Sequence, residues 1–287
     1  MVTLYQEARA ALRESGFKPR KRLGQHFLIH EGTIEAILRL LELSPEDEVV
    51  EIGPGLGFLT RRLARVARRL WAVEVDPFLV DWLRRSPLGS HAGFELVHGD
   101  ILKVPLKTFL PPRRVKLVAN LPYSISTPVL FRLFEQRDHF SHLVLMVQRE
   151  VAQRMAALPG TKSYGTLSIW CQIHGKVSAK VPVSPEAFFP RPAVRSTALK
   201  IALFPEPRFP PEDLSLLRLV VRSAFGKRRK TLGNALRGVL DKTREDIDVY
   251  LQKEGIDPGR RGESLTVEEF MRLARALKGH LSHAGAA

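Results

Sequence analysis

The sequence predicts an α/β protein with a doubly wound, mostly parallel, Rossmann-like sheet and a small all-helical C-terminal domain. Short apolar runs rich in β-branched residues alternate with segments of helical periodicity through the first two thirds of the chain. A glycine-rich turn follows the first strand-like run, and no strand pattern appears after a cluster of prolines near residue 205. Strands that alternate with helices indicate parallel pairing and right-handed crossovers. A ligand should therefore bind at the carboxyl ends of the strands.

The elements of this sheet can be followed in order along the chain. Residues 33–43 place Ile34 and Ile37 on one face of a helix. A second helix is expected at 59–69, between the first two strands. The strands themselves are the apolar runs at 48–52, 70–75, 94–98, 115–119 and 143–147.

A domain boundary is expected where four prolines fall within seven residues, beginning at Pro205. Everything beyond them has a helical or loop pattern. We therefore predict a first domain of residues 1–204, opened by a basic arm at 1–32, and a helical second domain of residues 205–287. Helices of the second domain are expected at 214–225, 230–240, 244–254 and 267–277.

The charge of the chain favours a polyanionic partner. Its 45 Lys and Arg residues exceed its 30 Asp and Glu residues, which gives a formal net charge of +15. Nucleic acid and an acidic membrane surface both fit that charge. No apolar run approaches the roughly 18 residues that span a bilayer, so a membrane-spanning protein is excluded and a cytoplasmic one is expected. The single cysteine, Cys171, lies in an apolar stretch and is expected to be a buried packing residue.

A glycine turn, Gly53-Pro54-Gly55-Leu56-Gly57, connects the first strand to the next helix. Glycines let the backbone approach a ligand closely, and the helix start presents unpaired N–H groups. The dinucleotide fingerprint needs a small residue where this chain has Phe58, which disfavours a nicotinamide or flavin cofactor. The spacing instead resembles motif I of the S-adenosylmethionine-dependent methyltransferases.

Acidic residues end the next two strands. Glu74 comes about 20 residues after the glycines, where an acid can accept hydrogen bonds from ribose hydroxyls. Asp100 and Ile101 follow the third strand. The resemblance implies that Glu74 binds the ribose of the methyl donor, and that Asp100 contacts its adenine amine with Ile101 alongside. Acids at strand ends also cap helices or pair with surface arginines, and that alternative stays open.

The fourth strand ends in Asn120-Leu121-Pro122-Tyr123, the most informative segment of the chain. An adenine amine is a poor nucleophile because its lone pair is delocalised, so positioning matters more than a strong base. The side-chain carbonyl of Asn120 and the backbone carbonyl of Leu121 can accept hydrogen bonds from such an amine. Pro122 stiffens the loop, and Tyr123 offers a ring on which a purine can stack. No metal is required, and an ordinary Asn-x-Pro turn is the alternative.

With these motifs the chain resembles the ribosomal RNA adenine N6-dimethyltransferases of the small-subunit type over nearly its whole length. Leu23-Gly24-Gln25-His26-Phe27-Leu28 is similar to the family segment that closes over the methyl donor. The resemblance implies S-adenosyl-L-methionine as cofactor, S-adenosyl-L-homocysteine as product, and His26 and Leu28 in the cofactor site. Relatives often have Asn in place of His26. A solvent-exposed histidine near a helix start is the alternative.

A second segment, Phe188 to Ser196, is similar to the family pattern F-x-P-x-P-x-V-x-S. The resemblance implies that Phe188 stacks on the target base opposite Tyr123. From the residues alone, the prolines predict an extended segment, and Phe188 and Phe189 could equally belong to the core.

Basic residues of both domains are expected to contact RNA phosphates, which position RNA without reading its sequence. Residues 222–240 include six basic residues and no acid, a pattern also typical of a solvated helix face or a nuclear-localisation signal. The arginines at 61, 62, 65, 68 and 69 would extend the track. The residues expected to bind RNA are Lys18, Arg20, Lys21, Arg22, Arg222, Lys227, Arg228, Arg229, Lys230 and Asn234.

The resemblance implies that two adjacent adenosines near the 3′ end of small-subunit rRNA are each dimethylated. The substrate would be a pre-assembled ribosomal particle and the enzyme a monomer, and an unpaired loop would release the base most easily. Three alternatives remain open: DNA adenine methylation, methylation of large-subunit rRNA, and a non-catalytic RNA-binding assembly or transcription factor that keeps the fold. Leu121 and the basic tail favour RNA, whereas intact Glu74 and Asn120 favour an active enzyme.

Overall fold

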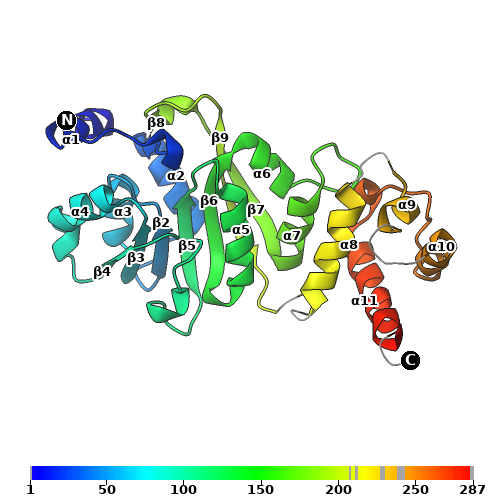
Figure 1. Ribbon diagram of the computed structural model, residues 1–287. Helices are drawn as coiled ribbons and strands as arrows, with labels where there is room; N and C mark the ends of the chain where they lie inside the picture. The colour runs from blue at the N-terminus through cyan, green and yellow to red at the C-terminus, as the bar shows by residue number, and fades with distance from the viewer. Residues whose placement is uncertain (1, 207, 211–212, 227–229, 238–242, 285–287) are drawn as a thin grey trace. The chain divides into compact units, whose positions relative to one another are not determined.

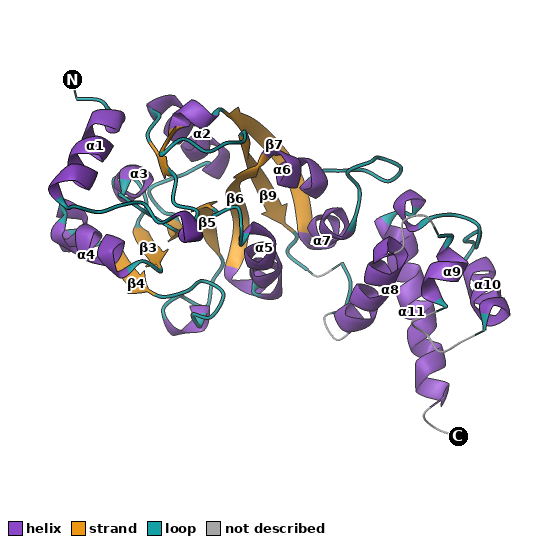
Figure 2. Ribbon diagram, turned by 45° about the horizontal axis from the view of Figure 1, so that its top comes forward, coloured by secondary structure: helices purple, strands orange, loops and turns teal. Residues whose placement is uncertain are grey.

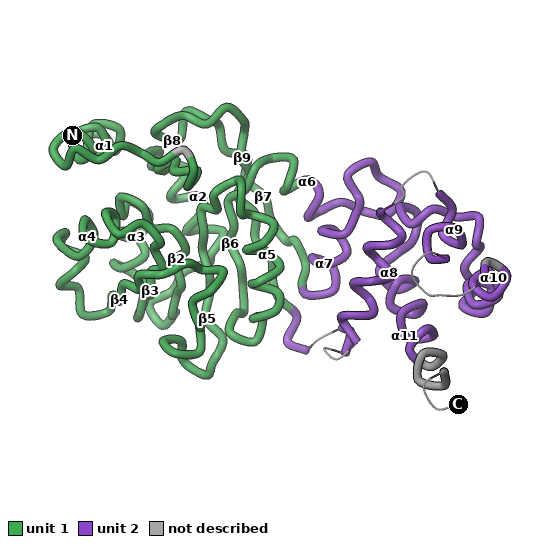
Figure 3. The backbone as a smooth tube through the Cα atoms, viewed as in Figure 1, with its two compact units in different colours: residues 1–152, 175–203 green, residues 153–174, 204–287 purple. Residues whose placement is uncertain are grey.

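The computed structural model describes residues 2–206, 208–210, 213–226, 230–237 and 243–284 (Figure 1). These residues form two compact units (Figure 3). Unit 1 comprises Met1–Ala152 and Gly175–Leu203, and unit 2 comprises Gln153–His174 and Phe204–Ala287. No helix within the described ranges is long and apolar enough to cross a membrane.

Unit 1 contains a seven-stranded sheet in the order β4-β3-β2-β5-β6-β9-β7. The first five of these strands run parallel, and β9 is antiparallel to both of its neighbours. The mostly parallel, doubly wound sheet is therefore confirmed, with an antiparallel edge that the periodicity did not predict. The strands are β2 (Glu48–Ile52), β3 (Arg69–Glu74), β4 (Phe94–His98), β5 (Val115–Asn120), β6 (Phe140–Gln148), β7 (Gly175–Val183) and β9 (Ser196–Leu203).

Helices cover both faces of this sheet (Figures 1 and 2). On one face, α1 to α4 share a hydrophobic core with Val49, Val118 and Val144 of the central strands. Burial of these apolar side chains is the main force that holds the layers together. The helices are α1 (Leu4–Glu14), α2 (Glu31–Leu41), α3 (Phe58–Ala64), α4 (Pro77–Arg85), α5 (Ser126–Glu135) and α6 (Arg149–Met155).

Two short strands lie apart from the main sheet. β1 (Phe27–Leu28) pairs antiparallel with β8 (Phe188–Phe189), so that Phe27 lies opposite Phe189 and Leu28 opposite Phe188. This pairing joins the N-terminal arm to a segment more than half the chain away. It brings together two of the segments that resemble the methyltransferase family.

Unit 2 is helical, with α7 (Thr166–His174), α8 (Leu214–Gly226), α9 (Leu232–Leu236), α10 (Arg244–Lys253) and α11 (Val267–Ala284). Its core contains Tyr164 and Phe270, and the ring of the half-buried Phe225 lies 5.9 Å from the ring of each, measured between centroids. Cys171 is buried in α7, and burial raises the pKa of its thiol, as expected for a packing residue.

Three local features differ from the sequence-based expectations. Residues 153–174, assigned by sequence to the first domain, cluster with unit 2 because α7 packs against α8 and α11. The helix expected at 59–69 ends at Ala64, since the Arg68 N–H donates to the Asp47 carbonyl and the chain then enters β3. The arm begins with α1, a helix started by a Thr3–Gln6 capping box.

Leu143 provides a test of the sheet core. Its side chain is fully buried in β6, so Leu143→Ala should lower the free energy of unfolding by about 2–5 kcal/mol through lost burial and a residual cavity. Urea unfolding followed by tryptophan fluorescence measures the change. The same substitution at Leu158, which is 66% exposed, should alter stability by less than about 0.5 kcal/mol. Equal effects at both positions would contradict this packing.

Candidate active site

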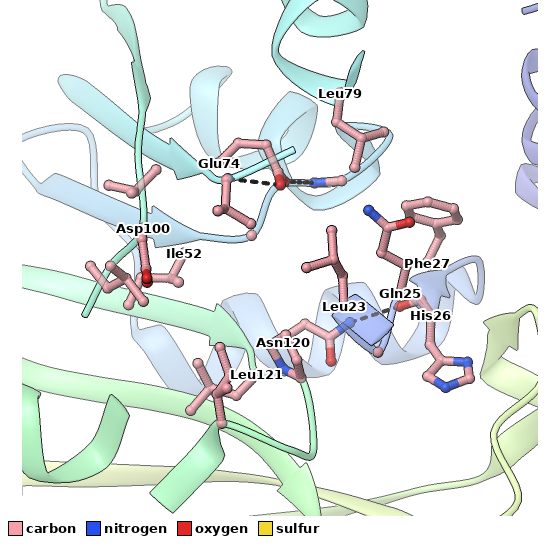
Figure 4. A pocket seen from close by; sticks show the side chains of 18 of the residues that line it. Leu23, Gln25, His26, Phe27, Ile52, Glu74, Leu79, Asp100, Asn120 and Leu121 are labelled. Carbon is pink, nitrogen blue, oxygen red and sulfur yellow. Dashed lines mark hydrogen bonds between the residues drawn. The ribbon is translucent and has the colours of Figure 1, made fainter. Parts of the chain in front are cut away.

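A pocket of about 770 Å³, part of it open to solvent, lies at the carboxyl ends of the parallel strands. Its walls come from the ends of β2, β3, β4 and β5 and from the arm between Leu23 and Phe27 (Figure 4). The sequence-predicted residues that line it are His26, Gly53, Gly55, Glu74, Asp100, Ile101, Asn120, Leu121, Pro122 and Tyr123.

The glycine turn adopts a backbone conformation that other residues rarely take. Gly55 has φ +59°, and a Cβ there would lie 2.8 Å from Cδ1 of Phe27 in the arm. Gly57 has φ +85°, and its Cβ would lie 2.9 Å from a methyl group of Leu83 in α4. Gly55 therefore lets the arm close over the turn, whereas Gly57, which does not line the pocket, allows close packing of α3 on α4.

Glu74 is buried at the end of β3, where backbone N–H groups hold its carboxylate. Oε1 accepts hydrogen bonds from the N–H groups of Val75 at 3.0 Å and Asp76 at 2.9 Å, and Oε2 accepts one from Gly55 at 3.3 Å. Burial raises the pKa of Glu74, and these N–H donors oppose the rise. The carboxylate thus ties β3 to the glycine turn and retains capacity for further donors.

Asp100 takes part in a local turn and also lines the pocket. Its Oδ1 accepts a hydrogen bond from the Leu102 N–H at 2.9 Å and so stabilises the turn after β4. No described residue donates to Oδ2. Since Asp100 lines the pocket beside the buried Ile101, one oxygen is structural and the other remains available to a ligand.

The Asn120 side chain is held in one orientation by the arm. Its Nδ2 donates a hydrogen bond to the His26 backbone carbonyl at 2.9 Å, drawn in Figure 4. Among the described residues none donates to the Asn120 side-chain carbonyl or to the Leu121 backbone carbonyl. The Leu121 N–H donates to the Met146 carbonyl of β6 at 3.1 Å, which fixes the loop to the sheet. Two carbonyl acceptors are therefore positioned and unpartnered at the pocket.

Tyr123 and His26 form a second connection across the pocket mouth. The Tyr123 hydroxyl lies 2.7 Å from Oγ of Ser196, the first residue of β9. The His26 ring stacks on the Tyr123 ring at 5.9 Å between centroids, and His26 Nδ1 lies 2.7 Å from the Pro190 carbonyl. His26 thus holds the arm, the 120–123 loop and the segment after β8 together.

Phe188 and Leu28 do not line the main pocket. The Phe188 ring is 3% exposed and belongs to the hydrophobic core. Because side chains alternate along a strand, β8 turns Phe188 inward opposite Leu28. Leu28 lines a smaller cavity of about 360 Å³ that shares His26, Gly53, Gly55 and Asn120 with the main pocket. The ring of Phe188 is therefore covered in this structure, as for a core residue.

Asp76 anchors the arm, a role that the sequence reasoning missed. Its fully buried carboxylate accepts a hydrogen bond from Gln25 Nε2 at 2.8 Å and forms an ion pair with Arg20 at 3.2 Å. It also caps α4 by accepting from the Phe78 N–H. Pro77 after Asp76 is the N-cap and N1 signal that could have revealed the capping role. The contacts to the arm had no local signal.

The basic residues expected to bind RNA differ in their availability. Arg20 is engaged by Asp76, and Arg61, Arg62, Arg68 and Arg69 each lie within 4 Å of a carboxylate. Asn234 Nδ2 donates to Thr231 Oγ1 at 3.0 Å. Lys18, Arg22, Arg222 and Lys230 are exposed and have no carboxylate partner within the described ranges. Lys227, Arg228, Arg229 and the side chain of Lys21 lie outside what the structure describes.

Glu51, which was not selected from the sequence, is buried in β2 just before the glycine turn. It is 2% exposed, its Oε2 has no hydrogen-bond partner, and it lines the smaller cavity with Gly53 and Asn120. Burial raises the pKa of Glu51 to about 8, and the nearby Glu74 carboxylate adds to the rise. At neutral pH the side chain is therefore largely protonated.

We expect Asp76→Ala to release the arm and destabilise unit 1. The change removes a helix N-cap, worth about 0.5–2 kcal/mol, and hydrogen bonds to a charged group, worth about 1.5–3 kcal/mol. Limited trypsin digestion should then cut faster after the basic residues of the arm. Asp81→Ala, at a 61% exposed side chain of α4, is the control and should leave the cutting rate unchanged. An Asp76 variant as resistant as wild type would contradict the anchoring role.

Glu51 should make stability depend on pH. Its pKa in the folded protein, about 8, exceeds the ordinary value of 4.5, so the folded state binds the proton more tightly. Its stabilising contribution is complete below pH 4.5 and declines as pH rises towards 8. Glu51→Gln removes this dependence, so the unfolding free energy of the variant relative to wild type should rise by up to about 1.4 kcal/mol per pH unit. Urea unfolding of wild type and Glu51→Gln from pH 5 to 8 measures this difference, and Glu46→Gln at an exposed site is the control. Unfolding free energies of wild type and Glu51→Gln that change in parallel with pH would disprove the prediction.

Comparison with known proteins assigns the chain to a family. A family model described as ribosomal RNA adenine dimethylase matches residues 16–278. The ribosomal RNA small subunit methyltransferase A of Geobacter metallireducens is 44% identical, over 93% of this chain and 98% of its own. A dimethyladenosine transferase from Plasmodium falciparum is 26% identical with a TM-score of 0.70, covering 86% of this chain and 96% of its own. The 23S rRNA methyltransferase ErmE is 26% identical with a TM-score of 0.66, covering 88% and 99%. The chain therefore belongs to the ribosomal RNA adenine dimethylase family.

Proposed function

We propose that this protein transfers methyl groups from S-adenosyl-L-methionine to the N6 amine of two adjacent adenosines near the 3′ end of small-subunit rRNA, and so produces N6,N6-dimethyladenosine. The observation that carries this proposal is the pair of positioned, unpartnered carbonyls of Asn120 and Leu121 at the pocket. Their arrangement suits a substrate with two N–H donors on one nitrogen. The name of the Geobacter relative, a small-subunit methyltransferase, supports the choice of RNA.

The pocket has the chemistry that the methyl donor needs. A Cβ at Gly53 would meet no atom closer than 3.8 Å, so the backbone there leaves room for a ligand. Glu74 offers a carboxylate for ribose hydroxyls, and the free oxygen of Asp100 offers an acceptor for an adenine amine. Val75, although 46% exposed, joins Leu79 and Ile101 in an apolar wall suited to a purine. When bound, S-adenosyl-L-methionine supplies an already activated methyl group.

The residues of the 120–123 loop contribute by positioning the adenine amine. The His26 carbonyl fixes the Asn120 amide, so its side-chain oxygen faces the amine without reorganisation. The Leu121 carbonyl accepts the second N–H. Two accepted hydrogen bonds favour the pyramidal amine, whose lone pair is then free to react. The residues need to provide no strong base.

Tyr123 is the ring that we propose for the target base. Its hydroxyl is fixed by Ser196 and one side of its ring by His26, so the ring is pre-oriented for a purine. Base stacking on an aromatic ring is worth about 1–3 kcal/mol. A second wall from Phe188 would require the core around β8 to open, since that ring is covered.

The RNA partner is supported by the formal net charge of +15 and by the exposed basic residues of both units. We propose that the enzyme is cytoplasmic and acts as a monomer on a pre-assembled small ribosomal particle. Little energy is needed to extract a base from an unpaired loop, which suits a target base that must enter a pocket.

Asn120→Ala should abolish methyl transfer but leave the methyl donor bound. The substitution removes the acceptor that orients the amine and the hydrogen bond to the His26 carbonyl, whereas Asp76 still holds the arm through Gln25 and Glu74 and Asp100 remain in place. Radiolabelled methyl transfer to unmethylated small ribosomal subunits measures the reaction, and calorimetry with S-adenosyl-L-methionine measures binding. We expect a rate loss of at least about 10²-fold with donor affinity within a few-fold of wild type. Near-normal turnover by the variant would refute the mechanism.

The same assay discriminates the alternatives when large subunits and duplex DNA are offered as acceptors. Small subunits should be preferred. Preference for large subunits would instead favour the activity named for ErmE. Donor binding that cannot be detected, with RNA binding preserved, would favour a non-catalytic factor.

A further inference from the structure

We propose that a groove between α1 and β8 binds an unpaired nucleotide adjacent to the target adenosine, with its base stacked on Tyr5 and its phosphates on Arg9 and Arg13. The inference rests on the proposed function, because it requires RNA at the neighbouring 120–123 loop. The groove would be a second RNA subsite, separate from the pocket that holds the methyl donor.

The groove has a volume of about 940 Å³, including its open side. Its walls include Tyr5, Gln6, Arg9 and Arg13 of α1 and the Phe189 ring of β8. The Tyr5 and Phe189 rings meet edge to face, with their centroids 5.5 Å apart and their planes at 87°. Two aromatic side chains are thus available at an open surface, as in sites that hold single-stranded nucleotides.

The α1 helix presents this surface because of its sequence pattern. Leu4, Ala8 and Ala11 are buried against unit 1, whereas Tyr5, Arg9 and Arg13 recur every four residues on an exposed face. Tyr5 is 43% exposed, and the Arg9 guanidinium lies 5.8 Å from its ring centroid. Nucleobases stack both on aromatic rings and on guanidinium planes, so this pair offers both surfaces.

The charges of the groove are uncompensated. Arg9 and Arg13 have no carboxylate partner in the described part of the chain, in contrast to Arg61, which forms an ion pair with Glu7 at 2.7 Å. That ion pair also neutralises an acid of α1. The groove therefore combines aromatic rings with free cations, and it fits a polyanion with planar bases better than it fits an apolar peptide.

The groove is connected to the catalytic loop by contiguous contacts. Phe189 in its wall is followed by Pro190, whose carbonyl lies 2.7 Å from His26 Nδ1. The His26 carbonyl in turn accepts the Asn120 hydrogen bond. His26 therefore contacts both the segment that follows the groove wall and the catalytic loop. The match to the family model begins at residue 16, and α1 precedes it.

Binding of a fluorescein-labelled RNA hairpin, with two adjacent unmethylated adenosines in its loop, tests the stacking role. Tyr5→Ala in the full-length protein should raise the Kd by about 5- to 150-fold, the effect expected for one lost stacking contact. Tyr5→Phe keeps the ring and should bind within about twofold of wild type. Equal losses in the two variants would overturn the stacking role.

The salt dependence of the same binding tests the phosphate contacts. Each lost contact to single-stranded RNA should lower the slope of log Kd against log salt concentration by about 0.7. We therefore expect a decrease from Arg9→Ala and a larger one from the double variant with Arg13→Ala. Arg39→Ala is the matched control. Arg39 is exposed in the last turn of α2, which is followed by the amino-terminal end of β2, whereas the pocket lies at the carboxyl ends of the strands. Slopes equal to wild type in the groove variants would overturn the proposal.

Methyl transfer by the wild-type protein separates this proposal from the proposed function. Absence of transfer to unmethylated small subunits refutes the proposed function itself. Normal wild-type transfer, with unchanged hairpin binding by the Tyr5 and Arg9 variants, refutes only the groove. Variants that bind the hairpin normally yet methylate subunits poorly would indicate a ribosomal protein as the occupant, and would also refute it. Unchanged thermal unfolding of each variant verifies that its fold is intact.

Discussion

The hydrogen bond from Asn120 Nδ2 to the His26 carbonyl is the contact on which the site depends. It joins a loop at the end of β5 to the N-terminal arm, across 94 positions of sequence. The bond satisfies the donor half of the amide, which leaves the acceptor half for a substrate. An amide held this way cannot rotate to exchange its oxygen and nitrogen without losing a hydrogen bond in a partly buried site. The arm therefore determines the chemistry of the loop as well as the closure of the pocket.

Burial controls the acids around this bond in two different ways. Glu74 is nearly as buried as Glu51, yet three backbone N–H groups donate to it and oppose the rise in its pKa. Glu51 has an unpartnered carboxyl oxygen, and its pKa rises to about 8. The turn after β3 contributes most to this contrast, since it directs the Asp76 and Val75 N–H groups towards Glu74, and the Gly55 N–H of the glycine turn is a third donor. Backbone donors thus distinguish an acid suited to accept hydrogen bonds from one that stays largely protonated.

Much of the site could be predicted from the sequence because parallel strands deliver their ends to one edge of the sheet. The glycine turn, Glu74, Asp100 and Asn120 each follow a strand, so recognising the strands was sufficient to place them together. The antiparallel strands β7 and β9 were missed, because the prediction followed strands that alternate with helices and no α-helix separates β7 from β9. The anchoring of the arm by Asp76 was also missed, since its partner Gln25 lies 51 positions away. The motif that contains Phe188 does not show which of two adjacent phenylalanines faces inward. Only the strand pairing shows this.

The arm also connects segments that lie far apart in the sequence. Phe17 stacks on Phe78 of α4 at 4.3 Å between ring centroids, Gln25 binds Asp76, and Phe27 pairs with Phe189. Each contact alone is worth only a few kcal/mol at most. Together they fix a segment that covers the glycine turn on one side and carries α1 to β8 on the other. A change in the part of the arm that follows α1 should therefore affect the pocket and the α1–β8 groove together, whereas a change on the exposed face of α1 should affect the groove alone.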